Sequence, residues 1–264
     1  MLASRLLLAV GVCGLVAPGA AWSSATTAHA GDLSETIKRV KPAVVAVGTY
    51  QALRRPPARL LGTGFAVADG RHVVTSAHVL PDKLDEQRKE SIAVFVGARG
   101  GAAVRTARVA GIDEDHDVAV LRISGPPVPT LRLGDDTWVE EGKGIAFTGF
   151  PIGPVLGLHP STHRGIVSAI APVSLPQVSP RQLDSRMIKQ LREGFPVFQL
   201  DATAYPGNSG SPLYDVETGV VYGIVNSVFV KETKERVLQD PSGIAYAVPV
   251  RYAKALLKKI GLPD

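Results

Sequence analysis

The sequence has a single cysteine, Cys13, among its 264 residues, which excludes a fold held together by disulfide bonds. Charged residues make up 20% of the chain, with no long block of either sign, and aromatic residues only 6%. The basic residues are scattered along the chain and do not alternate regularly with aromatic residues, which is typical of a solvated surface and not of a nucleic-acid-binding face. The hydrophobic fraction of 45% predicts a globular protein that is stabilised by core packing.

The first thirty residues differ from the rest of the chain. Arg5 is their only charged residue, and residues 6–16 are almost wholly apolar. Ala28-His29-Ala30 has the small-x-small form at which signal peptidases cleave. We interpret residues 1–30 as a secretory signal peptide, with cleavage after Ala21 as an alternative.

Two other uses of this segment compete with export. A membrane anchor is disfavoured because Gly11 and Gly14 interrupt an apolar run that is already short for a bilayer. A lipid anchor on Cys13 is disfavoured because Val10 to Val12 form a poor lipidation signal. Without the signal peptide, 28 Lys and Arg remain against 24 Asp and Glu, so the expected mature chain is mildly basic. An exported chain without disulfides favours a bacterial envelope protein, periplasmic or secreted, with no stable membrane anchor.

The mature chain begins with a predicted short helix at residues 32–40, which ends before Pro42. Beyond it, β-branched or alternating runs separated by Gly, Pro and charged turns predict strands. The first six runs are residues 43–49, 62–67, 72–75, 91–96, 103–112 and 118–123. A Pro-rich connector at residues 124–129 separates them from six further runs, at residues 144–150, 161–170, 197–201, 211–214, 220–229 and 243–248.

Two successive sets of six strands predict an all-β fold of two six-stranded antiparallel β-barrels, since closure hides exposed strand edges. Residues 31–128 form the expected N-terminal barrel and residues 129–264 the C-terminal one. A docking helix is predicted at residues 250–260, where apolar residues recur at helical spacing. The connection at residues 171–196 is long for a compact domain, and it is either a functional loop that controls access to the site or a plain surface insertion.

The segment from Pro206 to Pro212 reads Pro-Gly-Asn-Ser-Gly-Ser-Pro and carries the strongest chemical signal. Glycines on both sides of Ser209 let the backbone expose the hydroxyl and turn neighbouring N–H groups towards one point. The N–H groups of Gly207 and Ser209 are the candidate oxyanion hole. A Gly-Ser turn without function would be the default interpretation if this segment stood alone.

A base and a carboxylate precede this serine in the sequence. His78 follows the run 72–75 and can take a proton from Ser209, whose hydroxyl is otherwise a weak nucleophile. Asp117 leads directly into the run 118–123 and can orient the imidazole. The chain order His, Asp, Ser is that of the chymotrypsin-type triad.

The segments Thr75–His78, Asp117–Leu121 and Gly207–Gly210 resemble the three signatures of the trypsin-like peptidases, in particular the bacterial DegP/HtrA branch. Supporting similarity lies in residues 62–64, 149–153, 164–168 and 242–249. The resemblance covers nearly the whole mature chain. It implies perpendicular barrels with the active site between them, and peptide hydrolysis without ATP, metal or other cofactor.

The sequence departs from the family pattern at three points. Ser211 stands where the family usually has glycine, a variant that resembles the glutamyl endopeptidases. The sequence contains no match to the C-terminal PDZ modules of HtrA proteins, so we do not expect the regulation and the trimers of that family to carry over. Asn208 replaces the aspartate that animal digestive proteases pair with a new N-terminus, which disfavours activation by that route.

The resemblance leads us to expect an exported serine endopeptidase that cleaves unfolded or extended polypeptides, with a role in envelope protein quality control. The expected substrate-binding residues are Thr203, Ala204, Ile224, Val225 and Asn226; a substrate strand would add beside the last three. These residues hold no acid or base, so the pocket is expected to be apolar and to accept Val, Ala, Leu or Thr. A catalytically silent peptide-binding or chaperone module on the same fold is the alternative.

The remaining polar residues receive no functional role. The histidines at positions 72, 116, 159 and 163 are expected in turns or at strand ends, without the spacing of a metal site. Asp113 and Asp115 are expected to be solvated turn residues. A phosphate-binding glycine motif of the P-loop type is missing, so no nucleotide is implied.

Overall fold

The protein is described by a computed structural model that covers residues 32–98, 101–135, 139–151, 158–172, 194–226 and 244–263. These residues belong to one unit, which begins at Gly31. The predicted signal peptide and most of the connection at 171–196 lie outside them. No helix within the described ranges is both long and apolar enough to cross a membrane.

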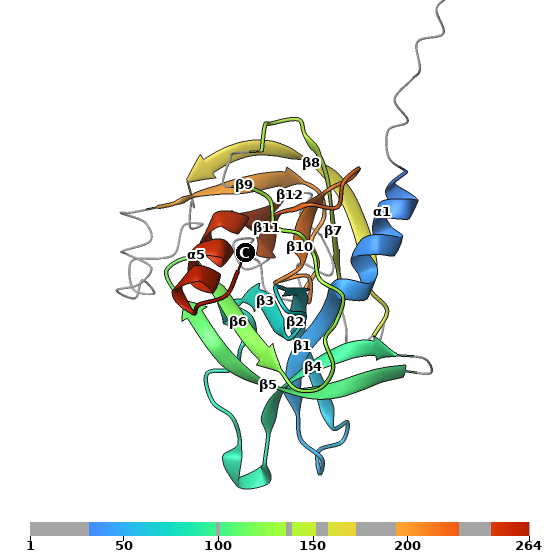
Figure 1. The fold of residues 1–264 in the computed structure, drawn as a ribbon, viewed down its shortest axis with the longest axis vertical. Helices are drawn as coiled ribbons and strands as arrows, with labels where there is room; N and C mark the ends of the chain where they lie inside the picture. Colours follow the sequence, from blue (N-terminus) through green and yellow to red (C-terminus); the bar gives the residue numbers. More distant parts are fainter. Residues whose placement is uncertain are drawn as a thin grey trace, which may run out of the picture. The chain divides into compact units, whose positions relative to one another are not determined.

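The strands of the first half close into one antiparallel barrel, drawn from blue to green in Figure 1. Its order is β1-β2-β3-β6-β5-β4. The strands are β1 (Val44–Tyr50), β2 (Ala58–Val67), β3 (His72–Ser76), β4 (Ser91–Ala98), β5 (Gly101–Asp113) and β6 (Val118–Ile123). Strand β2 begins four residues before the predicted run because its hairpin with β1 continues past a register shift at Val47/Gly48.

A second closed antiparallel barrel follows, with the order β10-β11-β12-β9-β8-β7. Its strands are β7 (Gly144–Gly149), β8 (Ser161–Pro172), β9 (Pro196–Asp201), β10 (Pro212–Asp215), β11 (Val221–Asn226) and β12 (Ile244–Pro249). The predicted all-β fold of two six-stranded barrels is therefore confirmed. Residues 227–229 of the predicted run 220–229 lie outside the described residues.

Several strands of the first barrel are buried on both faces, which explains why they read as continuous hydrophobic runs. In β1, Val45 and Val47 face the interior of the first barrel. Val44 and Ala46 belong instead to a core that also contains Phe150 and other residues of the second barrel. The barrels are thus held together by a shared apolar core, and each fully buried Val or Phe in it contributes about 1.5–3 kcal/mol.

The two helices connect the barrels further. Helix α1 (Leu33–Val40) precedes the first barrel and is capped by Asp32, yet the buried Thr36 donates its hydroxyl to the carbonyl of Glu217 in the second, at 2.9 Å. Helix α5 (Val250–Lys259) follows the second barrel but packs on β5 and β6 of the first. Its buried face contains Val250, Ala253, Leu256 and Leu257, the apolar positions that predicted the helix.

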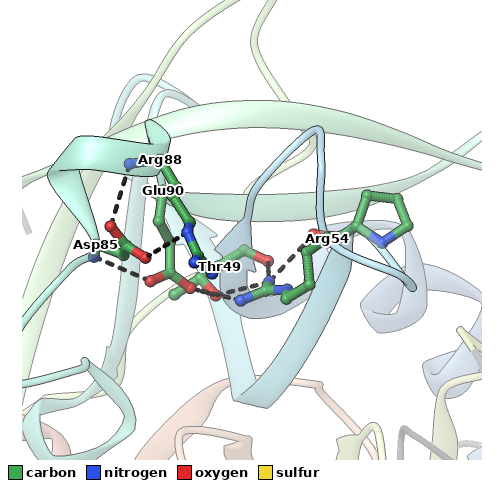
Figure 2. A network of polar contacts seen from close by, with 6 residues as sticks. Thr49, Arg54, Asp85, Arg88 and Glu90 are labelled. Atoms are coloured by element: carbon green, nitrogen blue, oxygen red, sulfur yellow. Dashed lines mark hydrogen bonds and ion pairs between the residues drawn. The ribbon is translucent and has the colours of Figure 1, made fainter.

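A polar network fixes the loop between β1 and β2 (Figure 2). One carboxylate oxygen of Glu90 accepts hydrogen bonds from the Thr49 hydroxyl and from the Arg54 guanidinium, both at 2.6 Å. The other accepts the backbone N–H of Asp85 at 3.1 Å. These bonds, from Thr49 first and then from Asp85 and Arg54, lower the pKa of Glu90 from 4.5 to about 2. The loop is therefore anchored to the start of β4 by a charged carboxylate.

Candidate active site

His78 and Asp117 are brought together by the pairing of β3 with β6. The register pairs Ser76 with Val118, so the short 3-10 turn Ala77–Val79 and the residue before β6 emerge side by side. The His78 Nδ1 atom lies 2.6 Å from one carboxylate oxygen of Asp117. The other oxygen accepts the backbone N–H of His78 at 2.8 Å. The carboxylate therefore fixes both the ring and the main chain of the histidine.

Asp117 is held in an uncommon backbone conformation, with a φ of 56°. Its carbonyl accepts the N–H of Ala77 at 3.1 Å. From the second barrel, the amide of Asn226 donates to the same carboxylate oxygen that meets the histidine ring, at 2.6 Å. The side chain of Asp117 is 16% exposed and that of His78 is 29% exposed. The pair thus lies where the barrels meet, with the imidazole still accessible.

Ser209 follows a turn whose type can be read from its residues. The N–H of Asn208 donates to the carbonyl of Tyr205 at 2.9 Å, which closes a four-residue turn with Pro206 and Gly207 at its centre. Gly207 has a φ of 100°, and proline at the preceding position leaves only a type II turn. Only glycine adopts this conformation freely, which is the physical basis of the Pro-Gly signal in the sequence.

The backbone around Ser209 is attached to both barrels. Its carbonyl accepts the N–H of Thr63 in β2 at 2.9 Å, and the next N–H, of Gly210, donates to Val225 in β11 at 2.8 Å. A Cβ atom on Gly62 would lie 2.9 Å from the Ser209 carbonyl oxygen and 2.6 Å from a methyl of Val79. The segment around Ser209 and the turn that contains His78 and Val79 therefore both contact β2 at Gly62.

The expected substrate-binding residues divide into two groups. Thr203 and Ala204 are partly exposed and precede the turn, as a pocket wall requires. The side chains of Ile224 and Val225 are fully buried in the cores. Strand β11 is paired with β10 on one side and β12 on the other at Ile224, so a substrate strand cannot add there. Within the described part of β11, a substrate strand could pair only at the end of the strand, at Asn226.

Ser211 does not face the expected pocket. Its side chain is fully buried, and a Cβ on Gly149 would come within 2.1 Å of its hydroxyl oxygen, so the hydroxyl points towards β7. Asn208 is also fully buried beside Gly149. Although Ser211 resembles the residue of the glutamyl endopeptidases at this position, its hydroxyl is therefore not placed to bind a substrate carboxylate.

Two expectations for the surrounding polar residues are wrong. Asp113 is not a solvated turn residue, because its carboxylate accepts the backbone N–H of His116 at 3.2 Å and lies 2.7 Å from the Nδ1 atom. The His116 ring stacks on Tyr252 of α5 with centroids 3.8 Å apart and meets Phe195 at 4.8 Å. This cluster supports the turn before Asp117. Local spacing could have indicated the Asp113 contact, since an Asp side chain commonly accepts hydrogen bonds from backbone N–H groups two or three residues further along the chain.

His163 lies within β8 and not in a turn or at a strand end. Its ring stacks on Phe147 at 4.9 Å and lies 5.8 Å from the ring of Tyr205. Burial lowers the pKa of His163, so the ring is neutral at pH 7. Within the described ranges, no group of three or more His, Cys, Asp or Glu side chains is placed to hold a metal ion.

A double barrel with a carboxylate, a histidine and a glycine-flanked serine at its junction defines a chymotrypsin-like hydrolase architecture. The family model of the trypsin-like peptidase domain matches residues 62–224, and the chain belongs to this family. Among curated relatives, a probable periplasmic serine endoprotease DegP-like from Halomonas elongata is 31% identical over 195 residues, 74% of this chain and 34% of the relative. Its counterpart from Pseudomonas putida strain F1 is 30% identical over 200 residues, 76% of this chain and 35% of the relative.

Solved structures show the same fold. The serine endoprotease from Yersinia pestis aligns with a TM-score of 0.60 and 24% identity, covering 87% of this chain and 66% of that one. The HtrA-type protease AlgW with a tripeptide also aligns with a TM-score of 0.60 and 24% identity, covering 87% of this chain and 63% of that one. The chain spans about a third of the length of the DegP-like relatives.

Proposed function

We propose that the chain is an exported bacterial serine endopeptidase that hydrolyses unfolded or extended polypeptides in the periplasm or after secretion. The observation that carries this proposal is the Asp117 carboxylate, which holds the His78 ring at 2.6 Å and accepts the Asn226 amide from the other barrel at 2.6 Å. A carboxylate that orients an imidazole beside an anchored serine is the arrangement that acyl transfer requires. We also propose a role in envelope protein quality control, which is compatible with the periplasmic location in the names of the DegP-like relatives.

In the proposed mechanism the Ser209 hydroxyl attacks the carbonyl carbon of the cleaved bond. His78 takes the hydroxyl proton at Nε2 and later gives it to the leaving amine. Asp117 keeps the Nδ1 proton in place, which fixes the tautomer and stabilises the imidazolium. Water then attacks the ester carbonyl of the acyl-enzyme. His78 takes the water proton and gives it to the Ser209 oxygen as the ester C–O bond breaks, which releases the acyl group as a carboxylic acid. All of these steps use groups of the chain itself, so the scheme requires no metal or nucleotide.

The N–H groups of Gly207 and Ser209 are the proposed oxyanion hole. The type II turn at residues 205–208 supports this role because it fixes the direction of the Gly207 N–H. Donors that are oriented before the reaction stabilise the developing charge by about 3–4 kcal/mol each in other enzymes. A substrate strand would pair at the Asn226 end of β11, next to the same site.

The proposed pocket for the residue before the cut bond is lined by Thr203 and Ala204. Neither carries a charge, and the nearby His163 is held neutral by burial. A Lys, Arg or Glu side chain would lose its water there without gaining an opposite charge, at a cost of several kcal/mol. We therefore expect cleavage after Val, Ala, Leu or Thr.

Digestion of denatured casein by the chain from residue 31 to 264 tests the proposal. We expect Ser209→Ala to abolish detectable cleavage, whereas Ser211→Ala, a change two residues away at a buried hydroxyl, should retain it. Mass spectrometry of the products should show most cuts after small or medium apolar residues. Cleavage by Ser209→Ala at the wild-type rate would contradict the assignment of Ser209 as the nucleophile. A folded wild-type protein that binds casein without cutting it would favour the alternative of a peptide-binding module. A majority of cuts after Lys, Arg or Glu would show that Thr203 and Ala204 do not line the pocket.

A further inference from the structure

Thr63 uses its backbone N–H and its hydroxyl to connect the first barrel with the segment around Ser209. It is fully buried in β2. Its backbone N–H donates to the carbonyl of Ser209 at 2.9 Å, and its hydroxyl donates to the carbonyl of Gly207 at 2.7 Å. The same hydroxyl accepts the N–H of Phe150, just after β7, at 3.0 Å. Its carbonyl accepts the hydroxyl of Thr75 at 2.6 Å. One side chain therefore joins β2, the end of β7 and the turn before the serine.

The bond to Gly207 acts on the most permissive residue of the turn. Gly207 has no Cβ, and its φ of 100° is one of several conformations open to glycine. The peptide between Gly207 and Asn208 is held at both ends, since its N–H bonds to Tyr205 and its C=O accepts the Thr63 hydroxyl. Without the hydroxyl, one of these two restraints on the glycine is lost.

Nothing else in the described residues replaces this restraint. Between described residues, the bond from the Thr63 hydroxyl is the only hydrogen bond that a side chain makes to the turn at residues 205–208. The amide of Asn208, which could have anchored the turn from within, is buried with neither its nitrogen nor its oxygen hydrogen-bonded. The conformation of the turn thus depends on a hydroxyl from the other barrel.

We propose that Thr63 is a positioning residue that locks the oxyanion turn through the Gly207 carbonyl. The inference rests on the proposed function, because it assigns Thr63 a role in keeping the Gly207 N–H directed at the reacting carbonyl. Thr63 acts on the turn and not on the substrate. Its loss therefore lowers the fraction of molecules with a competent oxyanion hole, which lowers kcat and leaves KM nearly unchanged.

Three variants of the chain from residue 31 to 264 test this assignment. Thr63→Val keeps the shape of the side chain but removes the hydroxyl, and Thr63→Ser restores it. Thr36→Val is the matched control, because Thr36 is also fully buried and also donates its hydroxyl to a distant backbone carbonyl, that of Glu217. Thr36 lies in α1, which contributes no residue to the site.

For Thr63→Val we expect kcat on a casein-derived peptide to fall by at least about tenfold, which corresponds to about 1.4 kcal/mol, with KM changed by less than about twofold. Thr63→Ser and Thr36→Val should stay within about threefold of the wild-type kcat. Amide exchange of Asn208, whose N–H closes the turn, should accelerate by about tenfold in Thr63→Val alone. The exchange measurement does not depend on activity.

Unchanged exchange at Asn208 in Thr63→Val would overturn the inference, whether or not the protein cleaves peptides. An equal fall in kcat for Thr36→Val at equal loss of stability would also overturn it, because the effect would then be purely structural. Wild-type protein that shows no Ser209-dependent cleavage would instead refute the proposed function, and faster exchange in Thr63→Val would still establish the restraint on the turn.

Discussion

The Glu90 network offers a stability prediction whose size can be worked out from its contacts. The pKa of Glu90 falls from 4.5 in the unfolded chain to about 2 in the folded one, through bonds from Thr49, Asp85 and Arg54 (Figure 2). Each pKa unit corresponds to about 1.4 kcal/mol, so the upper limit is about 3 kcal/mol. Because the network lies near solvent, with Arg54 25% exposed, screening reduces the expected value to about 1–2 kcal/mol.

The sign of the pH dependence follows from the lowered pKa. The charged form is favoured by folding, so the stabilisation is complete above pH 4.5 and is lost as the pH falls towards 2. Glu90→Gln should therefore lower the free energy of unfolding by about 1–2 kcal/mol at pH 7, and the difference from wild type should shrink at pH 3.

Urea denaturation at both pH values measures this difference. Glu35→Gln is the matched control, because the Glu35–Lys38 pair has side chains that are 64% and 68% exposed and should contribute little. A loss in Glu90→Gln that is equal at pH 7 and pH 3 would refute the electrostatic reasoning, and so would a loss no larger than that of the control.

The remaining predictions concern the turn before β6. Asp117→Asn should lower kcat about 10⁴-fold in a peptide assay, because the amide would favour the wrong tautomer of His78. Asp115 is exposed, so Asp115→Asn should keep a kcat near that of the wild type. If Asp115→Asn lowers kcat and Asp117→Asn does not, Asp115 is the residue that orients His78. Asp113→Ala should reduce the free energy of unfolding by about 1 kcal/mol in urea titrations, because it removes the partner of His116, and an unchanged value would show that this contact adds no stability.

The fold could be predicted from the sequence because its signals are local. Runs of β-branched residues between Gly and Pro located the strands, with most ends correct to one or two residues. The larger difference, at the start of β2, arises because pairing with β1 extends the strand through Ala58 to Leu61, where the alternation is poor. Such an extension depends on the partner strand and leaves little trace in the run itself.

The contacts that complete the candidate site could not be predicted in the same way. The bond from Asn226 to Asp117 joins residues 109 positions apart, and the bond from Thr63 to Gly207 joins residues 144 apart. Both depend on how the two barrels pack, which no local pattern encodes. The pairing of β11 on both sides also arises from barrel closure, so Ile224 and Val225 looked available as a substrate edge when only their sequence was considered.

Covalent labelling can show whether Ser209 is a nucleophile that His78 and Asp117 activate. A fluorophosphonate probe should add one phosphonyl group to the folded chain, and peptide mapping should place that group on Ser209. His78→Ala should slow the labelling by several orders of magnitude. If the folded wild-type protein stays unlabelled, or carries the group on another residue, Ser209 is not the activated nucleophile.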